Sequence, residues 1–86
     1  MKLKDTLTMM VSDDHNERLK AEYYQVRIRL EKLEDIILKY KLGKLDFEPA
    51  CPIDLLEYQG KVMFEYAKTL YQRLIYENVE LSEEEK

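Results

Sequence analysis

The chain has 86 residues, enough for one domain, and 37% of them are charged while 45% are hydrophobic. With two glycines and two prolines, this composition favours helices over sheets or disorder. Cys51 is the single cysteine and His15 the single histidine, which excludes an intramolecular disulfide and leaves a Cys/His zinc site without enough ligands. Because so short a chain is marginally stable alone, we expect it to complete its core by self-association.

The net charge of -4 disfavours a general binder of DNA or RNA polymers, but the charge is uneven along the chain. Residues 18–44 carry eight basic and four acidic side chains, whereas residues 45–86 carry four basic and ten acidic side chains. We find neither the apolar run of a signal peptide nor the roughly 18 apolar residues of a membrane span. We therefore expect a cytoplasmic protein that contacts no membrane, and we expect any anionic ligand to meet the basic segment.

Residues 13–42 are predicted to form the first long helix, because they lack glycine and proline and their apolar residues recur every three or four positions. Ser12, Asp13 and Asp14 offer an N-cap and acidic first-turn side chains, and Gly43 marks the end. The apolar seam consists of Leu19, Tyr23, Val26, Leu30, Leu33, Ile37 and Tyr40. Residues 1–12 are predicted to form either an arm or a short extra helix.

Residues 43–52 are predicted to be a connector, because Pro49 and Pro52 fix φ and lack an amide hydrogen. Residues 53–81 are predicted to form the second long helix, followed by an acidic tail over residues 82–86. The second seam consists of Ile53, Leu56, Gly60, Met63, Ala67, Leu70, Leu74 and Leu81. The expected fold class is all-α, a single domain over residues 1–86 built as an antiparallel hairpin of two long helices.

Both predicted helices carry further apolar and aromatic residues away from their seams. These are Tyr24, Ile28, Ile36 and Leu38 in the first helix, and Leu55, Val62, Tyr66, Tyr71 and Tyr76 in the second. A lone hairpin leaves such residues in water, and contiguous apolar surface usually marks an interface. We therefore expect a homo-oligomer.

No enzyme signature is present: the sequence contains no Walker loop, dinucleotide fingerprint, HExxH or CxxC motif. His15 in a first helical turn is more typical of a surface residue than of a proton shuttle, and Cys51 is more typical of a cap or a small buried hydrophobe than of a nucleophile. We therefore expect a protein that is not an enzyme and that uses no cofactor and no metal.

The cations of the first helix allow two interpretations. They are Arg18, Lys20, Arg27, Arg29 and Lys32. They can converge on phosphate oxygens if a second protomer brings its own copy alongside, since guanidinium groups bind phosphate through paired donors. They can equally form a solvated face with ion pairs four positions apart, such as Arg27 with Glu31 and Arg18 with Glu22. The seven tyrosines also allow two interpretations, since they can pack a core or stack on a nucleobase.

Two runs of the chain resemble the helical-hairpin family of small phage proteins that includes the anti-CBASS and anti-Thoeris sponges, whose members sequester cyclic-nucleotide immune signals. The runs are RLKAEYYQVRIRLEKLEDII at residues 18–37 and DLLEYQGKVMFEYAKTLYQRL at residues 54–74. The matching positions are Arg18, Glu22, Lys32 and Leu33, then Leu55, Leu56, Gln59, Met63, Tyr66, Leu70 and Arg73. The resemblance implies a homohexamer that holds nucleotides between protomers, near the start of the first long helix.

The resemblance also implies a function and a site. The chain would be a phage sponge for immune evasion in the host cytoplasm, binding a cyclic di- or trinucleotide or a cyclic ADP-ribose type signal without converting it. Arg18, Lys20 and Arg73 would contact phosphates, and His15 and Tyr24 would contact bases. The chain departs from the family pattern at His15, where the pattern has an aromatic residue. The alternative is a helical protein-interaction module that inhibits a host enzyme or serves a structural role.

Overall fold

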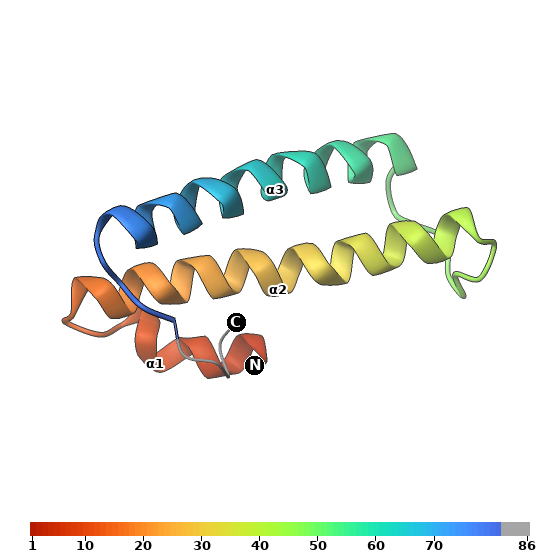
Figure 1. The fold of residues 1–86 in the computed structure, drawn as a ribbon. Coiled ribbons are helices and arrows are strands. Elements are labelled where there is room, and N and C mark those ends of the chain that lie inside the picture. The colour runs from red at the N-terminus through yellow and green to blue at the C-terminus, as the bar shows by residue number, and fades with distance from the viewer. Residues whose placement is uncertain (82–86) are drawn as a thin grey trace.

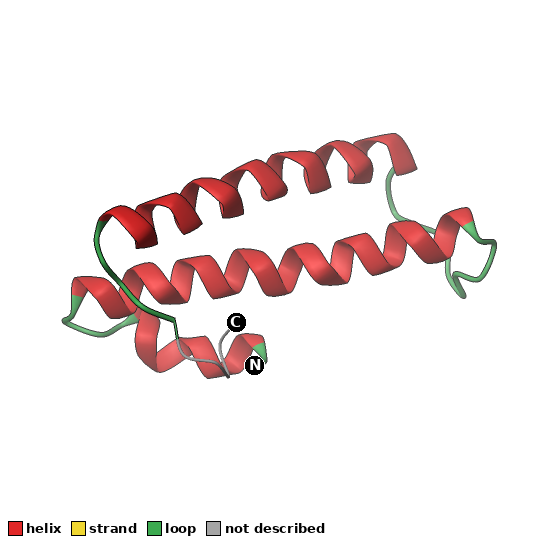
Figure 2. Cartoon of the chain, viewed as in Figure 1, coloured by secondary structure: helices red, strands yellow, loops and turns green. Residues whose placement is uncertain are grey.

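The computed structural model describes residues 1–81, and over that range it contains helices joined by loops and no strand (Figures 1 and 2). The elements in chain order are η1 (Leu3–Thr6), α1 (Leu7–Met10), α2 (His15–Lys41) and α3 (Ile53–Tyr76). The two long helices α2 and α3 lie side by side and antiparallel, and the short α1 packs beside the first half of α2 (Figure 1). The all-α hairpin is therefore confirmed, together with a short N-terminal helix. The predicted acidic tail lies outside the described residues.

Helix α2 begins and ends close to its predicted boundaries. The Asp14 side chain caps the start, accepting a hydrogen bond from the Asn16 amide at 2.9 Å. At the other end Gly43 has a φ of 70°, and the amide of Lys44 donates to the carbonyl of Lys39 at 2.8 Å. This is a Schellman motif, which needs a left-handed residue just after the helix and favours glycine there.

Helix α3 ends at Tyr76 rather than at the predicted residue 81. Asn78 has a φ of 56°, its amide donates to the carbonyl of Ile75, and the amide of Val79 donates to the carbonyl of Leu74 at 2.9 Å. This is a second Schellman motif, with asparagine in the left-handed position. The reversal carries Val79, which is 9% exposed, back into the core.

The main core lies where α2 begins and α3 ends. Its buried residues are Leu19, Tyr23, Tyr24, Leu70, Leu74 and Val79, with Met9, Val26, Ile28 and Leu81 packed around them. The buried members include seam residues of both long helices, which confirms the predicted faces at this end. At the connector end the seam is more open, and Tyr40 is exposed.

The expectation that a single hairpin leaves Tyr24 and Ile28 in water is wrong. Tyr24 is 4% exposed and Ile28 is half-buried, because the N-terminal segment and the residues after α3 cover a second face of α2. Thr6 of η1 is fully buried, and its hydroxyl accepts a hydrogen bond from the Gln25 side chain of α2 at 3.0 Å. Residues 1–12 are therefore a structural part of this end of the protein.

The outer surface of α3 remains rich in exposed apolar side chains, as the sequence predicted. They are Leu55, Tyr58, Val62, Tyr66 and Tyr76, and all of them except Tyr58 were predicted from the sequence. No segment among residues 1–81 buries this outer apolar surface, which from here on refers to those five residues. Phe64, Tyr71 and Ile75 are exposed as well, but they line the space between α2 and α3.

Gly60 lies on the face of α3 that packs against α2. A Cβ placed there would lie 3.8 Å from Leu33 Cδ2 and 3.9 Å from Ile37 Cδ1, which is ordinary contact distance. We expect Gly60→Ala to raise the free energy of unfolding by about 0.5–1 kcal/mol, because alanine favours the helix and fits the space. Urea unfolding measures this change.

Gly43→Ala is the matched control, since it adds the same methyl group where φ is 70°. We expect it to lower the free energy of unfolding, because the left-handed conformation strains an alanine. A Gly60→Ala protein that unfolds more easily than wild type would show that α2 and α3 approach more closely than described.

Candidate functional site

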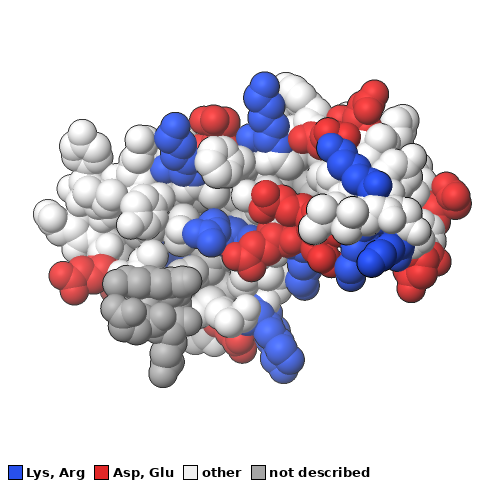
Figure 3. All heavy atoms as spheres, turned by 45° about the vertical axis from the view of Figure 1, so that its right-hand side comes forward, with Lys and Arg blue, Asp and Glu red and all other residues white. Residues whose placement is uncertain are grey.

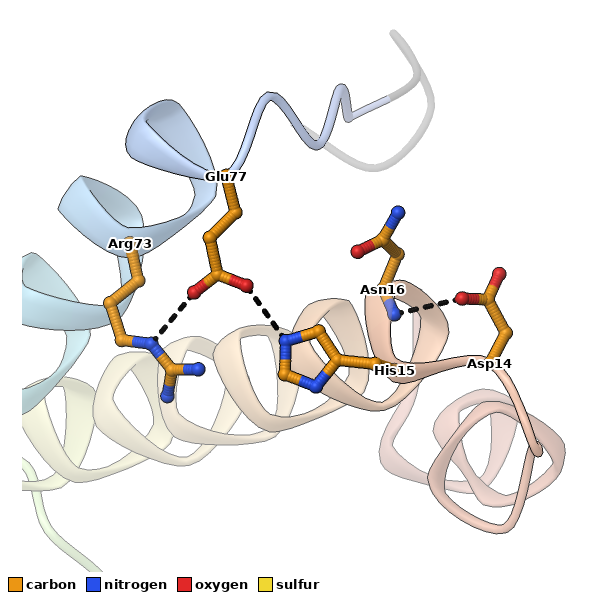
Figure 4. Close-up of polar contacts among 5 residues, drawn as sticks. All are labelled: Asp14, His15, Asn16, Arg73 and Glu77. Carbon is orange, nitrogen blue, oxygen red and sulfur yellow. Dashed lines mark hydrogen bonds and ion pairs between the residues drawn. The ribbon is translucent and has the colours of Figure 1, made fainter.

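Two of the predicted site residues meet at one carboxylate. His15 Nε2 lies 2.7 Å from Glu77 Oε1, and Arg73 Nε donates to Glu77 Oε2 at 3.1 Å (Figure 4). His15 and Glu77 are 62 positions apart in the sequence. We call His15, Arg73 and Glu77 the Glu77 bridge, and it ties the start of α2 to the end of α3.

All three side chains of the Glu77 bridge lie at helix ends. His15 is the first residue of α2, directly after the Asp14 cap, while Glu77 is the cap residue of α3 and Arg73 lies one turn before it. A carboxylate at a helix C-terminus faces the negative end of the helix dipole, so nearby cations favour its presence there. The Asn78 turn holds Glu77 at this end of the hairpin.

The Glu77 bridge keeps its carboxylate ionised. The hydrogen bond from His15 is the largest cause that lowers the pKa of Glu77, and the hydrogen bond and charge of Arg73 lower it further against an opposing effect of desolvation. A negative charge therefore lies between two potential phosphate ligands.

Arg18 lies one turn along α2 from His15, and positions three apart are neighbours on a helix surface. Its Nη1 donates to the backbone carbonyl of Ser12 at 2.7 Å, in the turn that joins α1 to α2. The predicted pair of Arg18 with Glu22 does not form among the described residues, and the Glu22 carboxylate accepts a hydrogen bond from the hydroxyl of Tyr66. Arg18 is exposed, so its remaining donors face solvent.

The other two predicted site residues are placed differently. Lys20 is half-buried, and its Nζ lies 3.3 Å from Glu17 Oε1 within α2. Tyr24 is buried in the core, with its ring centroid 5.8 Å from that of Tyr23. Within one protomer, the Tyr24 ring is therefore not presented at the surface for a base to stack on.

The middle of α2 matches the interpretation as a face of local ion pairs. Arg27 Nη2 lies 3.3 Å from Glu31 Oε1, which confirms that predicted pair, and its Nη1 donates to the Tyr23 hydroxyl at 2.7 Å. Desolvation lowers the pKa of Arg27, but its contacts with Tyr23 and Glu31 outweigh this effect and raise the pKa above its usual value. On the face shown in Figure 3, basic and acidic side chains are interspersed.

A groove of about 1070 Å³ runs between α2 and α3, and the sequence did not predict it. Its lining includes Tyr23 and Tyr71, whose ring centroids are 5.8 Å apart, together with Arg27, Phe64 and Lys68. A groove depends on how two helices pack, so no local pattern in the sequence marks it. Glu77 was missed as well, although its position four residues after Arg73 is a recognisable ion-pair spacing.

The Sequestin family model matches residues 13–83, a range that includes both long helices. The chain belongs to the Sequestin family. This match agrees with the resemblance to phage sponge proteins, and the family name denotes sequestration, which is binding rather than catalysis. No curated protein and no solved structure matches the chain.

Two further findings on this Sequestin concern metal binding and membrane crossing. Among residues 1–81, no group of three or more histidine, cysteine, aspartate and glutamate side chains is placed to bind a metal ion. Over the same residues, neither α2 nor α3 has the long apolar stretch that crossing a membrane requires.

Proposed function

We propose that this Sequestin is a phage anti-defence sponge that binds a cyclic-nucleotide immune signal in the host cytoplasm without converting it. The signal would be a cyclic di- or trinucleotide or a cyclic ADP-ribose type molecule. One observation carries the proposal: in a chain of a family named for sequestration, His15 and Arg73 converge from different helices on a single carboxylate, with Arg18 one turn away. Stoichiometric capture removes a signal from solution by tight binding alone.

The chemistry of these side chains suits phosphate. Arg18 and Arg73 present planar guanidinium groups that can donate two parallel hydrogen bonds to phosphate oxygens, and His15 can donate a hydrogen bond or stack on a base. Lys20 adds charge from the next turn of α2. We assign Tyr24 a supporting position beneath the site, because its buried ring packs with Leu19 rather than facing solvent.

Self-association would complete this site. The outer apolar surface of α3 is exposed in a single protomer, and burying such side chains in an interface stabilises it by roughly 1.5–3 kcal/mol for each fully buried one. A second protomer packed there would bring a further set of cations near the first. The hexamer implied by the resemblance is one closed arrangement of this kind.

The first test concerns assembly. We expect multi-angle light scattering at micromolar concentration to report a homo-oligomer, because the outer apolar surface has no cover within residues 1–81. A monomeric mass together with a cooperative thermal melt would contradict the shared site.

The second test concerns the ligand. A panel of cyclic di- and trinucleotides and cyclic ADP-ribose isomers should contain a compound that raises the melting temperature. At 100 times its Kd, a ligand adds about 2.7 kcal/mol of apparent stability, which for a domain of this size corresponds to roughly 10–20 °C. Linear 5′-AMP is the control, and we expect it to produce little shift.

The alternative function, a helical module that docks on a host enzyme or serves a structural role, draws on the same outer apolar surface. Its exposed tyrosines, leucine and valine suit a protein interface as well as they suit self-association. A protein that stays monomeric and responds to no compound in the panel would favour this alternative.

A further inference from the structure

Glu77 occupies the position that an anionic ligand would need. Its two carboxylate oxygens are held by two donors from different helices, Oε1 by His15 at 2.7 Å and Oε2 by Arg73 at 3.1 Å. Two oxygens of a phosphate group have a similar spacing and accept the same kinds of hydrogen bond. Figure 4 shows His15 and Arg73 each reaching a different oxygen of the Glu77 carboxylate.

We propose that Glu77 is an internal counter-anion, which holds His15 and Arg73 in place in the free protein and is displaced when a ligand phosphate binds. The proposal rests on the proposed function, since it concerns the same site. Glu77 would then determine which anions the site admits, because an anion must interact with the two donors, His15 and Arg73, better than the tethered carboxylate does.

The exposure of the Glu77 bridge permits this exchange. The side chains of His15, Arg73 and Glu77 are 56%, 45% and 33% exposed, so a ligand can reach both His15 and Arg73 from solvent. Exposed ion pairs contribute little to stability, so breaking them costs little. Arg73 uses only Nε in the bridge, and its two Nη groups have no hydrogen-bond partner among residues 1–81.

Glu77 can either compete with the ligand or orient His15 and Arg73 for it, and these two roles predict opposite results for Glu77→Gln. The amide keeps nearly the same shape and can still accept a hydrogen bond, but it has no negative charge. If Glu77 competes with the ligand, this variant should bind anions more tightly. If Glu77 instead orients His15 and Arg73 for the ligand, the variant should bind more weakly.

The test uses the single histidine of the chain, whose imidazole gives one set of NMR signals. Inorganic pyrophosphate is titrated into the full-length protein at constant pH and low salt, and the His15 signals report its apparent Kd. We expect Glu77→Gln to lower this Kd roughly fivefold relative to wild type, since one charge near the site is removed. Glu80→Gln is the matched control, because it removes the same charge three residues away and should change the Kd less than twofold.

A second variant covers the case in which Glu77→Gln does not fold. Glu77→Asp keeps the charge but shortens the side chain, so its carboxylate cannot reach both donors, and we expect it to lower the Kd relative to wild type. A Kd that is unchanged or higher in the folded Glu77 variants overturns the proposal, as does an absence of any His15 shift with pyrophosphate.

The same variants separate this inference from the proposed function. If pyrophosphate binds Glu77→Gln more tightly but no cyclic nucleotide binds either protein, the result supports Glu77 as a counter-anion and contradicts the proposed sponge function. If a cyclic nucleotide binds wild type and Glu77→Gln equally, the result supports the proposed sponge function and contradicts the counter-anion role of Glu77.

Discussion

Replacing Arg18 with alanine should raise the Kd for the stabilising cyclic nucleotide by about one to two orders of magnitude. A charge-assisted contact with phosphate contributes roughly 1.5–3 kcal/mol, and a guanidinium can make two such bonds at once. The free energy of unfolding should fall by less than about 1 kcal/mol, because the described bond of Arg18 is an exposed one to the Ser12 carbonyl. Titration calorimetry and urea unfolding measure the two effects.

Two further variants and a change in salt concentration serve as controls for the Arg18→Ala result. Arg18→Lys keeps the charge but loses the paired donors, so it should restore affinity only in part. Arg29→Ala removes an exposed cation from the same helix about three turns away, and should change affinity little. Binding by wild type should weaken as salt rises, since salt screens exposed charges. Equal affinity in wild type, Arg18→Ala and Arg29→Ala would move the site elsewhere.

Replacing Leu74 with alanine should cost about 2–5 kcal/mol of folding free energy. Leu74 is 2% exposed and packs in the main core with Tyr23, Tyr24 and Val79, so its removal leaves a cavity that the surrounding helices fill only partly. Because a small domain has little stability to spare, a loss of this size can unfold it at room temperature. Urea or thermal unfolding followed by circular dichroism measures the change.

Leu38→Ala is the matched control for Leu74, because it removes the same atoms from an α2 side chain that is 56% exposed. We expect it to change the free energy of unfolding by no more than about 0.5 kcal/mol. Both variants are compared with wild type at the same protein concentration, since an oligomer's stability depends on concentration. Similar losses in the two variants would mean that Leu38 is buried in an interface between protomers.

Local chemistry made most of the hairpin predictable. The three- and four-residue spacing of apolar residues identified both long helices and the faces that meet, and Leu30, Leu33, Ala67 and Leu70 are indeed buried. Gly43 was recognised as the end of α2 because glycine readily adopts a left-handed conformation. The end of α3 was predicted too late, since the Leu81 spacing suggested a continuing helix while Asn78 stops it.

The candidate site was predictable only in part, for a physical reason. Periodicity and capping act over a few residues, so the sequence by itself determined the two helices, their inner faces and the cations near the start of the first. Whether a second face of α2 is covered depends on how residues 1–12 fold back, and this decided that Tyr24 is buried rather than exposed. The contact of His15 with Glu77 spans 62 positions, and it exists only because the hairpin brings the start of α2 against the Asn78 turn at the end of α3.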